Sequence, residues 1–185
     1  MNAPHLEFRE VDRACWDDLA ALFEARGGPK SCWCMVWRQT PAEARQRDGK
    51  SRRAALRSRV MRGVPIGLLG YRDGVPVAWC SIAPRATYRS LGGIDDHADD
   101  ASAVWSLVCF FIKREFRGQG AADQLLRAAV AHARGRGAKI VEAYPVDPGS
   151  PSYRFMGFAG LFERAGFEKV GTAGRRRHVM RLELA

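Results

Sequence analysis

The sequence predicts an α/β domain of the α+β kind, with a mixed, mostly antiparallel central sheet of about seven strands flanked by about four helices. Three observations indicate this class. Strand-like and helix-like segments alternate along the chain, a turn at Asp73-Gly74 joins two apolar runs into a hairpin, and one long apolar run leads directly through a glycine-rich turn into a helix. Because 185 residues with 46% hydrophobic content suit one core, we expect a single domain over residues 1–185.

The strands are predicted from alternating or continuous apolar residues. They cover residues 6–11, the two arms of the hairpin within 65–88, residues 104–112, residues 138–147, the segment after Gly166, and residues 177–185. The run 104–112 is apolar throughout, which predicts a central strand with both faces covered. Residues 29–41, which begin and end with proline, are expected to be irregular, and residues 89–103 are expected to form a loop because they are polar and contain glycine.

The helices are predicted from apolar residues at helical spacing. They cover the segment from Cys15 to Gly27, where Gly27 is placed to end the helix, the basic segment 49–63, residues 118–137, and a short helix that stops at Gly166. In the basic helix the residues expected near one side are Ala54, Leu56, Val60 and Met61. In the long helix the inward residues are expected to be Leu125, Leu126, Ala129, Val130 and Ala133.

Composition limits the compartment and the partners. No apolar run approaches the roughly 18 residues of a membrane-spanning helix, and the first residues lack the features of a signal peptide, so we expect a soluble, cytoplasmic protein with no membrane partner. The five cysteines are odd in number and suit reduced thiols better than disulfides. The formal charge of +10 is spread along the chain and is mostly arginine, which argues against a nucleic-acid-binding protein.

The glycine-rich turn between the apolar strand and the long helix predicts a phosphate site. It reads Arg117-Gly118-Gln119-Gly120-Ala121-Ala122. Backbone N–H groups in the first turn of a helix have no partner within the helix, and together with the helix dipole they attract an anion. The two glycines remove side chains that would keep phosphates away. A P-loop is excluded because no Gly-Lys-Ser/Thr follows, and a Rossmann fingerprint would need glycine at Asp123, although Glu142 lies at a suitable distance for a ribose contact.

The same six residues match the Arg/Gln-x-x-Gly-x-Gly/Ala signature of the GCN5-related N-acetyltransferase (GNAT) superfamily. The surrounding segments resemble it too: an apolar strand before the signature, the helix after it, and the ending "LFERAGFEKVG" from Leu161 to Gly171. The likeness covers residues 104–184 and extends through the hairpin to residue 66. It implies a GNAT-like fold, a bacterial type of enzyme and acetyl-coenzyme A (acetyl-CoA) as the donor.

The resemblance also implies where the donor binds. The pyrophosphate would take the N–H groups of the signature, and the pantetheine arm would run beside the preceding strand, where a bulge splays the sheet. The cofactor-binding residues implied are Phe110, Phe111, Ile112, Arg117, Gly118, Gln119, Gly120, Ala121 and Ala122. The backbone N–H of Ile112 would polarise the thioester carbonyl.

The catalytic acid and base are left open by the sequence. Many relatives use a tyrosine of a "Leu-Tyr-Glu-Lys-x-Gly-Phe" motif as the acid, and Phe162 stands at that position here. Ser106 stands where the histone-acetylating branch has a glutamate. Tyr144, Tyr153 or a water is the candidate acid, and Glu142 acting through water is the candidate base, unless the amine arrives neutral.

The segment "SCWCMVW" is the other unusual stretch. Its Cys-x-Cys lacks the further ligands of a structural zinc site, so no metal is expected. In the family's order it lies between the first two helices, which form a wall of the acceptor cleft. Its predicted substrate-binding residues are Cys32, Trp33, Cys34 and Trp37, with plain core packing as the alternative.

These observations predict an acetyl-CoA-dependent N-acetyltransferase that acts on a primary amine by direct attack in a ternary complex. A small-molecule amine is the expected acceptor. One alternative is a macromolecular amine, of a protein or an aminoacyl-tRNA, docked on the basic helix. The other is a non-catalytic coenzyme A (CoA)-binding regulatory module, which the residues Phe162 and Ser106 would suit. A homodimer is compatible with the sequence.

Overall fold

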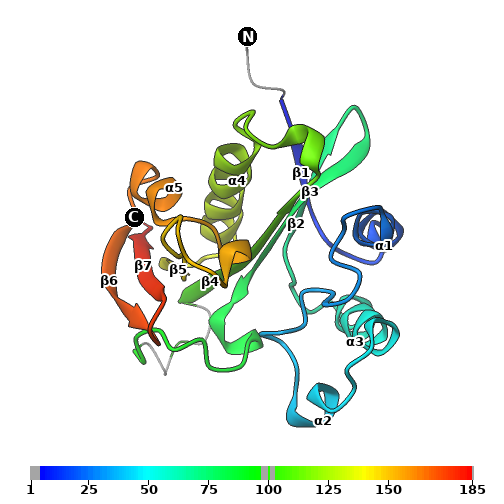
Figure 1. Cartoon of the computed structure of the whole chain (residues 1–185), viewed down its shortest axis with the longest axis horizontal. Helices are drawn as coiled ribbons and strands as arrows, with labels where there is room; N and C mark the ends of the chain where they lie inside the picture. Colours follow the sequence, from blue (N-terminus) through cyan, green and yellow to red (C-terminus); the bar gives the residue numbers. More distant parts are fainter. Residues whose placement is uncertain (1–4, 97–99, 101–102, 185) are drawn as a thin grey trace.

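The computed structural model describes residues 5–96, 100 and 103–184 (Figure 1). Its seven-stranded sheet has the order β1-β2-β3-β4-β5-β7-β6, and each neighbouring pair is antiparallel except β4 with β5. The strands are β1 (Glu7–Glu10), β2 (Leu68–Arg72), β3 (Val75–Pro84), β4 (Val104–Ile112), β5 (Ile140–Ala143), β6 (Glu168–Ala173) and β7 (Arg177–Glu183). The predicted mixed, mostly antiparallel sheet is confirmed.

Helices cover both faces of this sheet (Figure 1). They are α1 (Trp16–Glu24), α2 (Pro41–Ala44), α3 (Gly49–Met61), α4 (Ala121–Gly135) and α5 (Ala159–Arg164), with the 3-10 turns η1 (Arg85–Thr87), η2 (Arg114–Phe116) and η3 (Arg154–Met156). The helices α4 and α5 pack on one face, and α1 with α3 packs on the other. No helix among the described residues has the length and apolar character needed to cross a bilayer.

The predicted inward residues of α4 are all buried, which confirms its orientation on the sheet. The basic helix α3 needs one correction. Leu56 and Val60, one turn apart, are buried, whereas Ala54 is exposed. Ala54 lies about 200° around the helix from Leu56, so the two cannot face the core together. The hairpin is also as predicted, since Asp73 and Gly74 have φ values of 50° and 77°, as a tight type I′ turn requires.

The one-turn helix α2 was not predicted, because its stabilising contacts come from outside the turn. Thr40 and Glu43 form a reciprocal capping box, in which the Thr40 hydroxyl accepts from the Glu43 N–H and the Thr40 N–H donates to the Glu43 carboxylate. The guanidinium of Arg59 on α3 donates to the same carboxylate at 2.8 Å. This ion pair joins α2 to α3.

Replacing Glu43 by glutamine should make the protein less stable in a pH-dependent way. The Arg59 guanidinium holds the pKa of the Glu43 carboxyl at about 2, below its ordinary value of 4.5. A lowered folded-state pKa stabilises the protein above the ordinary value, and this contribution disappears as the pH falls towards 2. We expect Glu43→Gln to lower the free energy of unfolding by about 1 kcal/mol at neutral pH after allowance for solvent screening. Urea unfolding at a series of pH values measures this, and a loss independent of pH would contradict it.

Candidate active site

The central strands β4 and β5 separate after a short paired segment. The register runs from Val104 opposite Ile140 to Leu107 opposite Ala143. Beyond that point β4 continues to Ile112, with no strand beside it on this edge among the described residues. The neighbouring strand β5 ends before Pro145, which has no N–H to offer to a ladder. A central strand therefore has an open edge next to a gap in the sheet.

A β-bulge in β4 lies at the point of separation. Ser81 of β3 pairs with Cys109 and the next residue, Ile82, pairs with Leu107, so Val108 is the extra residue. An extra residue reverses the alternation of side chains, and Leu107 and Phe110 accordingly both pack on the α4 side. The bulge that the family resemblance implied is present.

The open edge of β4 presents backbone donors. The N–H of Lys113 donates to Val77 O at 2.9 Å, on the β3 side. Since ladder bonds alternate along an antiparallel pair, the backbone groups of Phe110 and Ile112 point to the open edge. The Ile112 carbonyl accepts from Arg117 Nε at 2.8 Å. The N–H groups of Phe110 and Ile112 are left for a ligand oxygen.

The glycine-rich turn forms an exposed cradle of N–H groups, here called the phosphate cradle (residues 117–122). Gly118 and Gly120 have φ values of 72° and 77°, a conformation that favours glycine. The helix α4 begins directly after Gly120, and its first internal bond is from the Gln124 N–H to Gly120 O. The N–H groups that precede Gln124 have no helical acceptor. A Cβ at Gly118 would meet nothing within 4 Å, so the space above the turn is open.

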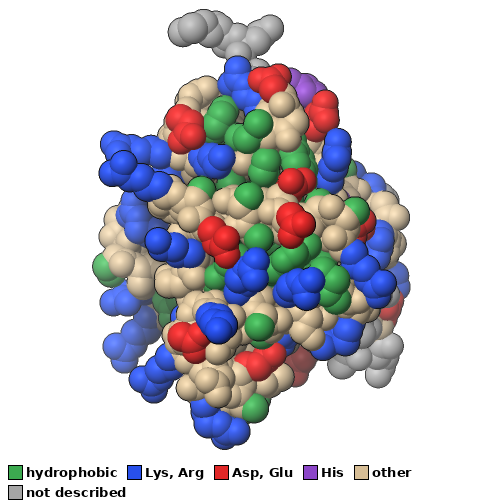
Figure 2. Space-filling model, turned by 90° about the vertical axis from the view of Figure 1, so that its right-hand side faces the viewer, with side chains coloured by type: hydrophobic (Ala, Val, Ile, Leu, Met, Phe, Trp, Pro, Cys, Tyr) green, Lys and Arg blue, Asp and Glu red, His purple; other side chains and the backbone are tan. Residues whose placement is uncertain are grey.

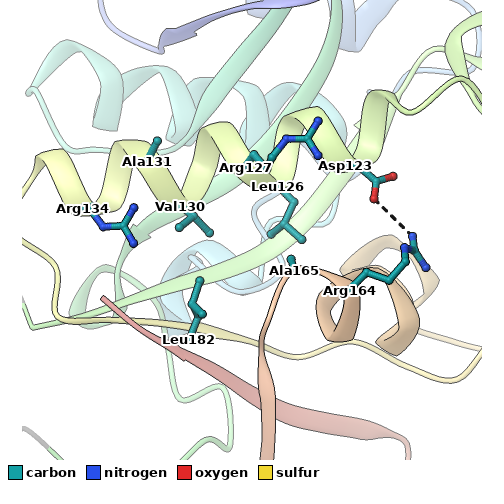
Figure 3. Close-up of a pocket in the computed structure, with 9 residues that line it drawn as sticks. All are labelled: Asp123, Leu126, Arg127, Val130, Ala131, Arg134, Arg164, Ala165 and Leu182. Carbon is teal, nitrogen blue, oxygen red and sulfur yellow. Dashed lines mark hydrogen bonds and ion pairs between the residues drawn. The ribbon is translucent and has the colours of Figure 1, made fainter. Parts of the chain in front are cut away.

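A groove lined by both apolar and charged side chains runs along the same helix, between α4 and α5 (Figure 3). Its volume is about 370 Å³, and its walls come from one side of α4, from Arg164 and Ala165, and from Leu182 of β7. At one end Arg164 forms an exposed ion pair with Asp123 at 3.4 Å. None of the residues predicted to bind the cofactor lines this groove.

Phe162 occupies the position of the family's usual acid. Its side chain is fully buried and stacks edge-on with Phe110 and Phe167, at centroid distances of 6.0 Å and 5.3 Å. A Cβ at Gly157 would come within 2.8 Å of the ring. The ring therefore packs under the open edge of β4 and supplies no proton.

Tyr144 belongs to a buried hydrogen-bond network. Its hydroxyl donates to Glu142 Oε1 and lies 3.2 Å from the hydroxyl of Ser106, and all three side chains are fully buried. Burial and the carboxylate of Glu142 raise the pKa of the Tyr144 hydroxyl, so it stays protonated. The structure therefore brings together Ser106, which stands where part of the family has a glutamate, and Tyr144, one of the candidate acids.

The carboxylate of Glu142 is held by arginines. Arg181 of β7 donates its Nε to Glu142 Oε2 at 2.7 Å and binds Asp96 through both terminal nitrogens, at 2.6 and 2.7 Å. Arg85 lies 3.6 Å from Glu142 Oε1 and also pairs with Asp96. Both carboxylate oxygens of Glu142 thus have partners. This geometry suits a carboxylate that holds the Tyr144 hydroxyl in a fixed orientation. Sequence reasoning missed both arginines, because nothing distinguishes them from the many others in the chain.

Tyr153 is placed differently from Tyr144. It precedes η3, which packs against β4, and it has a φ of 59°, a strained conformation for an aromatic residue that often marks a functional position. Its side chain is half-buried beside Trp37, at a centroid distance of 6.4 Å, and its hydroxyl has no partner among the described residues. It is therefore the tyrosine whose hydroxyl is free for a ligand.

The four predicted substrate-binding residues occupy two environments. Trp33 is 2% exposed and stacks on Trp16 in the core, and Cys34 lies below the sheet surface with its thiol 3.3 Å from that of Cys109. Cys32 is half-buried beside Cys34. Only Trp37 joins the aromatic cluster around Tyr144 and Tyr153. Of the four predicted residues, Trp37 is therefore the best candidate for the wall of the acceptor cleft.

All five cysteines are free, and no cluster in the described residues has the composition of a metal site. The Cys109 thiol and burial raise the pKa of Cys34, which keeps it neutral.

This fold and site define a class of protein: an α+β domain that can hold an extended, anionic ligand between a parted central strand and a helix N-terminus. The model of the acetyltransferase (GNAT) family matches residues 16–167. The chain belongs to this family. No curated protein matches the chain.

Solved structures share the fold at low identity. A putative acetyltransferase of Salmonella typhimurium, yncA, with its cofactor acetyl-CoA, is 20% identical with a TM-score of 0.58, covering 100% of this chain and 95% of that one. The ribosomal-protein-alanine N-acetyltransferase of Brucella melitensis is 21% identical with a TM-score of 0.58, covering 97% and 100%. The paia N-acetyltransferase of Thermoplasma acidophilum, in complex with coenzyme A, is 14% identical with a TM-score of 0.59, covering 97% and 99%.

Replacing Arg181 by methionine should destabilise the fold strongly, because Glu142 would keep its buried charge without its best cation. We expect the free energy of unfolding to fall by about 3–5 kcal/mol. Arg164→Met is the matched control, since it breaks an exposed ion pair and should cost less than about 1 kcal/mol. Urea denaturation compares the two, and similar losses would show that the buried network contributes little.

Proposed function

We propose that the protein transfers the acetyl group of acetyl-CoA to a primary amine of a small molecule. The observation that carries this proposal is the phosphate cradle beside the open edge of β4, in a chain of the acetyltransferase family. The cradle offers clustered N–H groups to a pyrophosphate, and the open edge offers main-chain donors to an extended amide arm. Both features suit one ligand that is anionic at one end and peptide-like along its length.

The residues that would hold the donor are those the sequence predicted. The N–H groups of residues 117–122 would bind the pyrophosphate, with the Arg117 side chain fixed to the Ile112 carbonyl. The N–H of Ile112, or of Phe110 on the same edge, would polarise the thioester carbonyl. Phe111 lies between these two residues, but its backbone pairs with Trp79 of β3 and its side chain packs on the α1 side of the sheet, so it offers no donor to the open edge.

The donor supplies an activated acetyl group and a thiol leaving group. In direct attack a C–N bond forms and a C–S bond breaks, the amine loses one proton, and the departing sulfur gains one. The half-buried Tyr153 is our candidate for giving that proton, because its hydroxyl has no competing partner. Glu142 and Tyr144 would act one step further away, by holding the end of β5 in place, and a dedicated base is not required when the amine binds neutral.

The contacts that the arginines of the basic helix α3 already make favour a small acceptor over a macromolecule. Three arginines of α3 are already engaged: Arg53 with Glu24 at 2.9 Å, Arg59 with Glu43 at 2.8 Å, and Arg52 with a backbone carbonyl at 2.6 Å. Over the middle of the face that carries α1 and α3, acidic and basic side chains are interspersed, whereas basic ones gather along the left edge of the view (Figure 2). The middle of this face therefore lacks the continuous positive patch expected for binding tRNA.

Acetyl-CoA binding should depend on the open space above Gly118. We expect Gly118→Val to weaken binding at least about tenfold, because the added side chain would meet the phosphates. Gly63→Val is the matched control, since Gly63 has a similar φ of 74° and equally open surroundings at the end of α3. Isothermal titration calorimetry measures both. Wild-type protein that does not bind acetyl-CoA would refute the proposed function.

Substituting Tyr153 and Tyr144 separately should distinguish a catalytic role from a structural one. We expect Tyr153→Phe to lower kcat by about 10²-fold or more with unchanged acetyl-CoA binding, as for loss of a general acid. Tyr144→Phe should instead cost about 1–3 kcal/mol of stability, because it leaves the Glu142 oxygen without its buried donor. Thiol release from acetyl-CoA with an amine panel gives the rates. The reverse pattern would assign the acid to Tyr144, and binding without turnover on any amine would support the non-catalytic module.

A further inference from the structure

The turn between β6 and β7 is strongly basic and borders a surface hollow. Three successive arginines follow one another here: Arg175 and Arg176 lie in the turn, and Arg177 begins β7 and is followed by His178. These residues and the loop 147–151 line a hollow of about 300 Å³. Arg175 and Arg176 are exposed to solvent and His178 pairs with Asp147, so Arg177 is the basic residue of this group that reaches inward.

Arg177 extends from this hollow into the aromatic cluster of the candidate active site. Its guanidinium carbon lies 4.6 Å from the ring centroid of Trp37, 5.2 Å from that of Tyr153 and 5.9 Å from that of Tyr144. The same cluster contains Val108, the bulged residue of β4. Arg177 is thereby placed at the end of the gap between β4 and β5, on the side away from the phosphate cradle.

The positive charge at this position is not balanced by the protein. Among the described residues, no carboxylate lies within ion-pair distance of Arg177, and the one hydrogen bond of its guanidinium is from Nη1 to the carbonyl of Leu91, at 2.8 Å. The acidic groups nearby have other partners: Asp147 binds His178 and Glu142 binds Arg181. Arg89, 5.3 Å from the Trp37 ring, adds a second cation.

Trp37 contributes a donor that also has no acceptor. Its indole Nε1 is buried and makes no hydrogen bond in the described part of the chain. A buried N–H without a partner is costly and uncommon in native structures, and such groups are often satisfied by a ligand or by water. An oxyanion in the cluster would pair with the Arg177 guanidinium, which lies over the face of the same indole ring.

We propose that the acceptor amine carries a carboxylate and that Arg177 binds it, so that the substrate is of the amino-acid type. This inference rests on the proposed function and names its substrate class. With Nη1 bound to Leu91, the Nε and Nη2 groups form one free edge, which matches the two oxygens of a carboxylate. Burial lowers the pKa of Arg177, and a bound anion would offset that cost. Polyamines should be poor substrates, because the arginines repel them.

The test compares amines that differ only in the carboxylate. Acetylation of the common α-amino acids and of their α-carboxamides is measured with wild-type protein, Arg177→Gln and Arg177→Lys. The charge control is Arg57→Gln, an exposed arginine on α3, on the opposite side of the molecule from β6 and β7 (Figure 1). Because the basicity of each amine is the same for every protein, the ratio of the two rates isolates the contribution of the side chain.

We expect wild-type protein and Arg57→Gln to favour at least one amino acid over its amide. Arg177→Gln should reduce that preference about 10- to 100-fold, through KM rather than kcat, and Arg177→Lys should restore part of it. Unchanged acetyl-CoA affinity and thermal midpoint would show that the variants are folded. Calorimetric binding of the same amines to the CoA-saturated protein gives the comparison without turnover.

Two outcomes would overturn the inference while leaving the proposed function intact. One is wild-type protein that binds acetyl-CoA and acetylates or binds amides as well as amino acids. The other is a preference for amino acids that persists in Arg177→Gln. Wild-type protein that does not bind acetyl-CoA contradicts the proposed function itself, and the inference with it.

Discussion

Backbone pairing between β4 and β5 stops after Leu107 and Ala143, and the candidate site follows from that interruption. A parallel pair inside a sheet would normally satisfy every N–H and C=O on both strands. Here a bulge at Val108 on one strand and Pro145 after the other end the ladder. The unsatisfied groups of β4 then face a gap in the centre of the sheet, next to the start of α4, where further N–H groups lack partners.

Where β4 and β5 separate, side-chain contacts between buried charged and polar groups stabilise the sheet in place of backbone hydrogen bonds. Arg181 on β7 binds Glu142 on β5 and Asp96 in the loop before β4. Three segments far apart in the chain therefore meet at one guanidinium. Tyr144 and Ser106 then connect β5 to β4 by side chains close to the point where the backbone bonds end. The polar network thus stabilises the edge of the gap without closing it.

The two ends of the gap differ in chemistry. At one end the phosphate cradle offers backbone N–H groups, and beneath the open strand Phe162 and Phe110 form an apolar floor. At the other end Arg177 and Trp37 present side-chain donors within an aromatic cluster. A long anionic donor and a smaller acceptor can therefore approach the same strand from opposite directions, which is the arrangement that direct transfer requires.

Local patterns in the sequence determined the strand and helix types, the hairpin and the phosphate cradle, because each depends on residues close together in the chain. Apolar spacing sufficed for α4, and the glycines at 118 and 120 made the cradle recognisable, since both take the αL conformation that glycine favours. Only the tertiary structure decided which side chains are buried and which ones contact each other. It buried Trp33, paired Glu142 with Arg181 and placed Arg177 beside Trp37, since such contacts join distant segments and no local spacing distinguishes one arginine from another.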